Sequence, residues 1–132
     1  MKRDLSLIRE LLLKLEEMHD RPFATWMVYP QDEELAVEGY TANEIGYALE
    51  LMVESGLIQT QPGSGFSADG ALMFKRLSWE GCEYLDDVRD PEVWRRTKEG
   101  ASKIGGASLS FAWEMAKAYG KHVAKERLGL DL

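Results

Sequence analysis

Cysteine and long apolar runs are both scarce in this 132-residue chain. Its single cysteine, Cys82, cannot form an internal disulfide and is typical of proteins from a reducing compartment. No apolar stretch approaches the roughly 20 residues that a helix needs to span a bilayer. The leucines at 11–13 make too short a run for the apolar region of a signal peptide. We therefore expect a soluble, cytoplasmic protein with no membrane partner.

Side chains that could do chemistry are few and far apart. His19 and His122 are distant in the sequence, whereas metal sites need clustered ligands. Cys82 falls on an apolar stripe, where cysteine usually behaves as a small buried hydrophobe. Adjacent carboxylates such as Asp86 and Asp87 point to different sides of a helix. We therefore expect no catalytic residue, no bound cofactor and no metal, and hence no enzyme.

Charge is unevenly distributed along the chain, whose net charge is −7. Residues 1–93 carry 8 lysines and arginines against 19 acidic side chains, whereas residues 94–132 carry 8 against 4. An acidic body followed by a basic region hints at two interaction surfaces. The alternative, that the charges only solvate their own helices or pair with each other, stays open.

Residues 41–85 form the stretch around which the chain is organised. Residues 41–44, Thr-Ala-Asn-Glu, have the form of a capping box and predict the start of a helix. Gly56 stands where a left-handed residue would end that helix. Its predicted apolar face consists of Ile45, Ala48, Leu49, Met52 and Val53.

A hairpin and a further helix follow in this stretch. Residues 57–60 and 72–77 are predicted as strands, joined by turn formers at 62–65 and 69–70. Ser78 can cap the next helix. The buried face predicted for that helix is Trp79, Cys82, Leu85 and Val88.

The N-terminal region is predicted to contain a helix over residues 4–18 and a strand over 25–29. The helix should bury Leu5, Ile8, Leu11, Leu12 and Leu15 and expose Arg9, Glu10, Lys14, Glu16 and Glu17. Residues 35–37 are expected to pair back on the strand as a hairpin. Trp26, Trp79 and Trp94 are expected to pack in the core.

Two helices are predicted at the C-terminal end. Asp90 can cap the first, with Pro91 at its first position, and this helix should run to about residue 102. Gly105 and Gly106 break it, and Ser108 can cap a last helix that reaches about residue 127.

The order helix, strand, hairpin turn, strand, helix resembles the second half of a winged-helix domain. Residues 54–58 (ESGLI) and 76–85 (RLSWEGCEYL) resemble the segments that flank the wing in such proteins. A second helix before the main one, usual in that fold, has room only at residues 31–34. We therefore expect an α+β, winged-helix-like domain over residues 1–98, with a C-terminal helical extension over 99–132.

Residues 1–15, 38–40, 54–58, 76–81 and 89–94 together resemble a bacterial and prophage family, domain of unknown function 2513. The resemblance covers most of residues 1–98. It implies a winged-helix-like fold and a bacterial or phage origin. It implies no activity and brings no site residues.

Two interaction surfaces follow from these patterns. One face of the last helix carries aromatics beside small residues, which suits a contact with a second copy. Its candidate oligomer contacts are Leu109, Trp113, Ala116, Tyr119 and Val123. The candidate nucleic-acid contacts are Lys75, Arg76, Arg95 and Arg96.

The predicted helix over residues 41–55 disfavours nucleic acid as the partner. It stands where a winged helix would read the major groove, yet it carries three glutamates and no lysine or arginine. We therefore expect a non-enzymatic interaction or adaptor protein that binds a protein partner or itself. The alternative is a DNA-binding transcriptional regulator that uses the wing and the basic C-terminal region.

Overall fold

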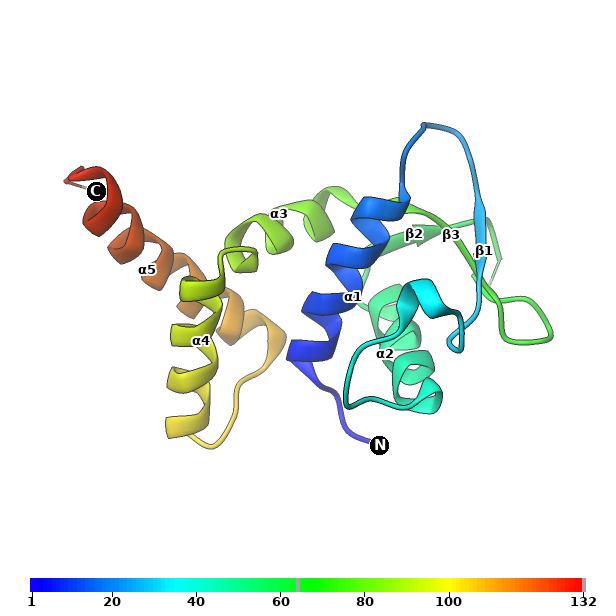
Figure 1. Ribbon diagram of the computed structural model, residues 1–132, viewed down its shortest axis with the longest axis horizontal. Coiled ribbons are helices and arrows are strands. Elements are labelled where there is room, and N and C mark those ends of the chain that lie inside the picture. Colours follow the sequence, from blue (N-terminus) through cyan, green and yellow to red (C-terminus); the bar gives the residue numbers. More distant parts are fainter. Residues whose placement is uncertain (64, 132) are drawn as a thin grey trace. The chain divides into compact units, whose positions relative to one another are not determined.

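The computed structural model describes residues 1–63 and 65–131, and within them it contains helices and one small sheet (Figure 1). The elements are α1 (Leu5–Met18), β1 (Trp26–Val28), η1 (Glu33–Leu35), α2 (Ala42–Glu54), β2 (Ile58–Thr60), β3 (Leu72–Leu77), α3 (Trp79–Val88), α4 (Pro91–Lys103) and α5 (Leu109–Leu128). The α+β class expected from the sequence is confirmed. Ser64, part of the predicted turn at 62–65, lies outside the described residues.

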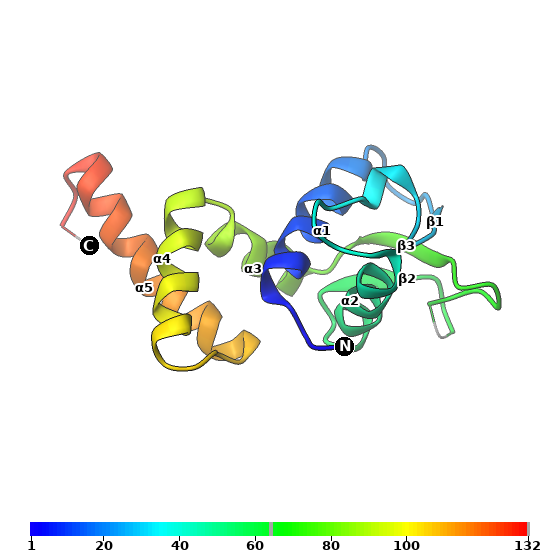
Figure 2. The ribbon, with the colours of Figure 1, turned by 60° about the horizontal axis from the view of Figure 1, so that its bottom comes forward.

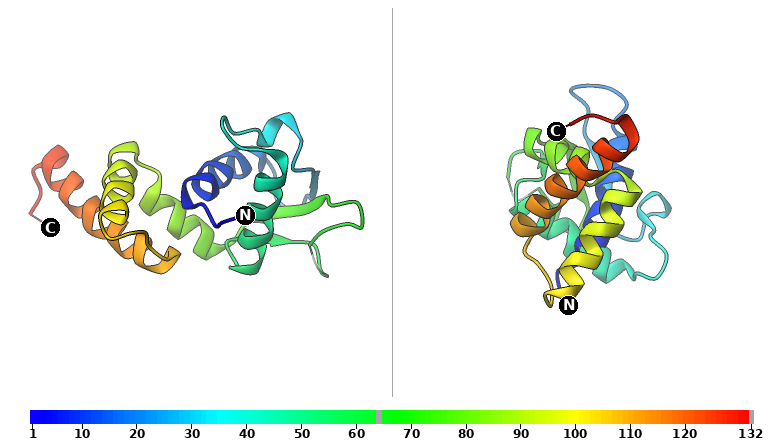
Figure 3. Two further views of the ribbon diagram at one scale, coloured as in Figure 1. Left: turned by 90° about the horizontal axis from the view of Figure 1, so that it is seen from below. Right: turned by 90° about the vertical axis from the view of Figure 1, so that its left-hand side faces the viewer.

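The chain divides into two compact units, Met1–Cys82 and Glu83–Leu132. The sequence placed this boundary later, between residues 98 and 99. In the structure α4 packs along α5, so that the two helices form one hairpin within the second unit (Figure 3). A boundary at 98 would cut through the middle of α4.

The sheet of the first unit is antiparallel, with the strand order β1-β3-β2. The hairpin of β2 and β3 extends beyond α1 and α2 (Figure 2). The predicted pairing of residues 25–29 with 35–37 is wrong, because β1 pairs with β3 and residues 33–35 form the short helix η1. Asp32 accepts a hydrogen bond from the Tyr29 backbone at 2.8 Å, and this closes the turn that leads into η1.

Helix α1 contributes most of one side of the core, facing α2 and β3. Its buried side chains are Leu7, Ile8, Arg9, Leu11, Leu12 and Leu15. Leu5 is only half-buried, and Arg9 was wrongly expected to face water, since it is 9% exposed. The guanidinium of Arg9 keeps a carboxylate partner there, Glu10 at 3.0 Å. The buried stripe is therefore wider than the helical spacing of the leucines indicated.

Helix α2 begins and ends as the sequence predicted. The Glu44 backbone donates to Thr41 Oγ1 at 3.2 Å, and the Thr41 backbone donates to Glu44 Oε1 at 2.9 Å, which completes the capping box. Gly56 has a φ of +80°, a conformation that glycine adopts without strain. Local sequence alone therefore sets both ends of α2.

The start of α3 is locked to the end of α2 through Ser78. The Ser78 hydroxyl donates to the Gly56 carbonyl at 2.6 Å and accepts from the Gly81 backbone at 2.9 Å. The Ser78 backbone donates to the Leu57 carbonyl at 3.0 Å. Ser78 therefore caps α3, as predicted, and also fixes how the helix is rotated.

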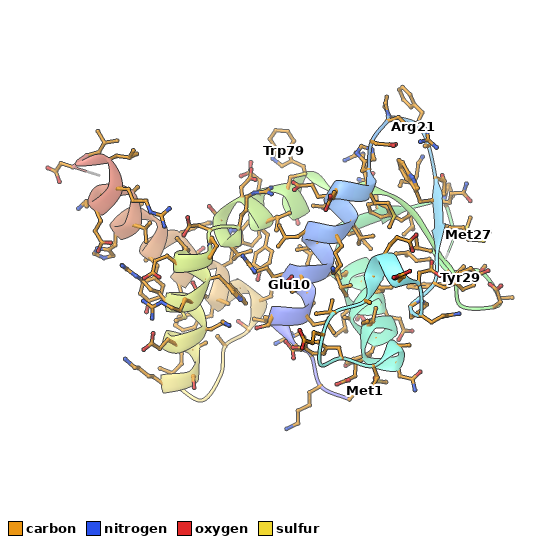
Figure 4. The ribbon with its side chains drawn as sticks, in the orientation of Figure 1. Met1, Glu10, Arg21, Met27, Tyr29 and Trp79 are labelled. Carbon is orange, nitrogen blue, oxygen red and sulfur yellow. The ribbon has the colours of Figure 1, made fainter. Side chains whose placement is uncertain are left out.

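Because of this rotation, the buried face predicted for α3 is wrong. Gly81 and Leu85 are buried, whereas Cys82 is exposed. Trp79 is 77% exposed and projects away from the ribbon in Figure 4. Of the three tryptophans expected in the core, Trp94 is buried, Trp26 is half-buried and Trp79 is not buried. Helical spacing did not reveal this, because Gly81 leaves no apolar mark in the sequence.

The second unit is a helical hairpin held by caps and ion pairs. Asp90 and Ser108 cap α4 and α5 as predicted. Across the hairpin, Arg96 pairs with Glu126 at 3.0 Å, and Arg127 bonds to Asp90 at 3.2 Å. None of the described helices is long and apolar enough to cross a membrane.

Gly81→Ala should destabilise the first unit by about 2 kcal/mol, the usual size of an overpacking strain. A methyl group at this position would lie 2.0 Å from the Leu57 carbonyl oxygen, so the helix would have to shift. Urea denaturation followed by circular dichroism measures the change.

Gly120→Ala is the matched control, because a methyl group there meets nothing within 4 Å and the residue lies inside α5. It should be neutral or stabilise by up to about 1 kcal/mol, the helix preference of alanine over glycine. Equal stability of the two variants would show that the contact between α3 and Leu57 is not tight.

Candidate functional site: a groove beside helix α2

A groove of about 780 Å³ runs along the exposed side of α2 in the first unit. Its other wall comes from the turn after β1 and from the loop between β2 and β3. The described residues that line it are Met1, Pro30, Gln31, Ala42, Asn43, Gly46, Tyr47, Glu50, Val53, Glu54, Phe66, Asp69 and Gly70. All of them belong to one compact unit, so the groove is part of a single folded body.

The α2 wall presents residues that lie three, four and seven apart, which places them on one helix face. Gly46 lies near its middle, where a methyl group would come within 3.2 Å of Pro30 Cγ. The missing side chain lets the turn after β1 come close to the helix. Glu50 and Glu54 continue the face toward the end of α2, and both are exposed.

The opposite wall is held in place by hydrogen bonds to Asp69. Tyr29, at the end of β1, donates its hydroxyl to Asp69 Oδ2 at 2.8 Å (Figure 4). Ser67 donates to the other oxygen of Asp69, and the Ala71 backbone donates to Ser67 Oγ at 3.1 Å. These bonds tie the β2–β3 loop to β1 and keep the groove formed without a ligand.

The same bonds keep Asp69 charged. The Ser67 hydrogen bond, and then the Tyr29 hydrogen bond, lower the pKa of the Asp69 carboxyl below its usual value. The bond to Asp69 in turn raises the pKa of Tyr29. Asp69 is therefore a carboxylate at any pH near neutrality, and Tyr29 is a neutral donor.

The groove is acidic. Glu50, Glu54 and Asp69 line it, and no lysine or arginine occurs among its described lining residues. The first unit as a whole carries seven lysines and arginines against fourteen acidic side chains, a net charge of −7. Such a surface attracts cations and repels polyanions.

A smaller hollow of about 420 Å³ lies beside the start of α1 and shares Tyr47 with the groove. In it, the Tyr40 hydroxyl donates to Asp4 Oδ2 at 2.7 Å. Burial, and then this hydrogen bond, raise the pKa of Tyr40 to about 12. Tyr40 therefore keeps its proton near neutral pH, where it holds the N-cap of α1 and does not act as a base.

The candidate oligomer contacts on α5 face the interior of their own unit. Ala116 and Val123 are buried, and Leu109, Trp113 and Tyr119 are half-buried. Trp113 packs edge-on against Tyr84 at 5.3 Å, and its indole nitrogen donates to Asp87 at 2.6 Å. The second unit therefore already packs much of this face itself, and Leu109, Trp113 and Tyr119 stay partly exposed.

The candidate nucleic-acid contacts do not share one compact unit. Lys75 and Arg76 lie on β3, where Lys75 is half-buried and Arg76 exposed. Arg95 and Arg96 lie on α4 and are paired with carboxylates; Glu92 is 2.7 Å from Arg95 and 2.9 Å from Arg96. These two arginines are already neutralised by partners on their own helices.

The groove was not predicted from the sequence, although its parts carry signals. In the sequence, Glu50 and Glu54 indicated only that the helix over residues 41–55 disfavours DNA. The bond between Tyr29 and Asp69 joins residues 40 apart in sequence, which no local pattern reveals. Across residues 1–63 and 65–131, no three metal-ligating side chains cluster, and His19 packs on Trp26 at 5.3 Å.

Comparison with known proteins gives a family and one relative. A family model described as "Hypothetical protein (DUF2513)" matches residues 2–108. An uncharacterized protein of Haemophilus influenzae is 28% identical over 128 residues, which cover 97% of this chain and 99% of the relative. No solved structure matches the chain.

Tyr29→Phe should raise the pKa of Asp69 toward the usual value of about 3.9, because the carboxylate loses a donor. In the folded protein the pKa is lowered. The stabilisation from this network is therefore complete above the unfolded pKa and is lost as the pH falls through the folded value. Carboxyl carbon NMR across a pH titration measures both variants.

Tyr47→Phe is the control, since it removes a hydroxyl from the same groove but leaves the bonds of Tyr29 and Ser67 to Asp69 in place. Its Asp69 titration should match that of the unaltered protein. A Tyr29→Phe titration that also matched would mean that the loop is not held through Tyr29.

Proposed function

The chain belongs to the DUF2513 family, and for this member we propose a non-enzymatic interaction protein that binds a protein partner through the groove beside α2. The observation that carries the proposal is the groove itself. It is a formed hollow of about 780 Å³ in which three carboxylates stand beside apolar side chains. The wall opposite α2 is held by Tyr29 and Asp69 before any ligand arrives.

The scaffold we propose for this function is winged-helix-like. The first unit runs in the order α1, β1, η1, α2, β2, β3, with the sheet order β1-β3-β2. In such a fold η1 would correspond to the second helix, α2 to the recognition helix, and the β2–β3 loop to the wing. The groove then lies between the two elements that a DNA-binding winged helix would present to its target.

The charge of this face favours a protein over a duplex. Double-stranded DNA carries one negative charge per about 1.7 Å of its axis and is bound through lysine and arginine. Glu44, Glu50 and Glu54 are the charged side chains of α2. Placed against a phosphate backbone, they would oppose binding.

The partner that fits is a basic segment of a protein. Its lysines or arginines would meet Glu50, Glu54 and Asp69, and its apolar stems or neighbours would lie on Val53 and Phe66. Long cationic side chains can bury their stems while keeping the charge at the carboxylates. Electrostatic attraction of this kind raises the association rate and weakens with salt.

A fluorescein-labelled peptide of alternating lysine and alanine tests the proposal by fluorescence anisotropy. It should bind the full chain, and the affinity should fall as salt is added. Glu50→Lys should weaken binding about tenfold or more, because it places a cation where the lysines of the peptide bind. A tenfold change in affinity corresponds to about 1.4 kcal/mol. Glu17→Lys, the same change on an exposed helix position outside the groove, should leave binding unchanged.

A random-sequence DNA duplex is the opposing probe in the same assay. No binding is expected even at low salt. Steep, salt-dependent binding to the duplex that is lost in Lys75→Ala/Arg76→Ala would replace this proposal with the DNA-binding regulator. Equal peptide binding by Glu50→Lys and Glu17→Lys would remove the groove as the binding site.

A further inference from the structure

We propose that the segment taken by the groove is helix α5 of a second copy of this chain, so that the protein associates with itself. The inference rests on the proposed function of the groove and names its partner. It uses the lysine-bearing face of α5, which adjoins the aromatic face that the sequence suggested, since Lys117 lies over the Trp113 ring at 5.1 Å.

One face of α5 carries a regular stripe of lysines. Lys117, Lys121 and Lys125 are spaced four residues apart, which puts them on one face at intervals of about 6 Å. Lys117 and Lys121 are exposed, and Lys125 is partly exposed. Exposed Ala118 and half-buried Ala124 stand beside them and add little bulk.

Contacts inside the second unit leave this stripe able to bind. The three lysines line a hollow of about 740 Å³ whose other side carries Asp86, Asp87 and Asp90. Asp87 already accepts from Trp113, and Asp90 accepts from Arg127. Lys117 contacts Glu114 at 3.4 Å and lies over the Trp113 ring at 5.1 Å, and Lys125 is 3.8 Å from Asp131.

The groove offers carboxylates at the same interval. Glu50 and Glu54 are also four residues apart on one helix, so their spacing along α2 is again about 6 Å. Two neighbouring lysines of α5 can therefore meet two carboxylates of α2 when the helices lie side by side. Asp69 stands on the opposite wall and adds negative charge there, while its two oxygens accept from Tyr29 and Ser67.

The shapes agree with a helix lying in a groove. This recognition mode uses side chains at intervals of three, four and seven residues along one helix face. Ala118 and Ala124 stand beside the lysines and leave room for the groove wall.

The two units also differ in charge. The first unit has a net charge of −7, whereas the second unit has nine lysines and arginines against nine acidic side chains. Arg95, Arg96 and Arg127 pair with carboxylates of their own unit, but the α5 lysines are spared from this network. One chain thus carries both halves of a complementary contact.

Sedimentation velocity of the full chain over a range of concentrations tests the inference. The average mass should rise above that of the 15.0 kDa monomer with concentration and return toward it as salt is added. Glu50→Lys and Lys121→Glu should each weaken self-association about tenfold. The two reversals combined in one chain should restore it, because the charges face each other again with signs exchanged.

Glu17→Lys is the matched control and should associate like the unaltered chain. Circular dichroism of each variant shows whether it is folded, and both changed positions are exposed helix sites. A chain that stays monomeric at every concentration would overturn the inference, and so would a double reversal that fails to restore association. If the labelled lysine peptide still bound the groove of that monomer, the proposed function would stand without self-association.

Discussion

The contact between Ser78 and the backbone of Gly56 and Leu57 is the constraint on which the first unit depends. It joins the end of α2 to the start of α3 through hydrogen bonds of 2.6 and 3.0 Å. Gly81 admits the Leu57 carbonyl into the first turn of α3, where any side chain would collide with it. This close approach fixes the rotation of α3, and with it the exposure of Trp79 and Cys82.

The groove depends on a second long-range tie, between Tyr29 and Asp69. It connects the end of β1 to the β2–β3 loop, which is also held by the bond from Gln61 to Thr25 at 3.3 Å and by Ser67 within the loop. A groove formed in advance spares a ligand the cost of ordering the loop. The same bonds lower the pKa of Asp69, so that shape and charge have one cause.

Ion pairing separates the cations of the second unit into two groups. Arg95 pairs with Glu92 within α4, whereas Arg96 pairs with Glu126 and Arg127 bonds to Asp90, which ties α5 to α4 and its cap. The lysines of α5 line a hollow of the same unit, where Lys117 contacts Glu114 and the Trp113 ring and Lys125 contacts Asp131. The basic C-terminal region indicated by composition is therefore partly structural, and its lysine stripe is suited to an outside partner.

The sequence by itself determined the features that arise within a few neighbouring residues. The capping box at Thr41, the caps at Ser78, Asp90 and Ser108, the turn at Gly56 and the α+β class all follow from local hydrogen bonds and helical spacing. Tertiary structure alone decided the pairing of β1 with β3, the rotation of α3, the place of the unit boundary and the groove. Each of these depends on contacts between residues far apart in the chain, and glycine or a single tyrosine hydroxyl leaves no periodic signal from which such contacts could be predicted.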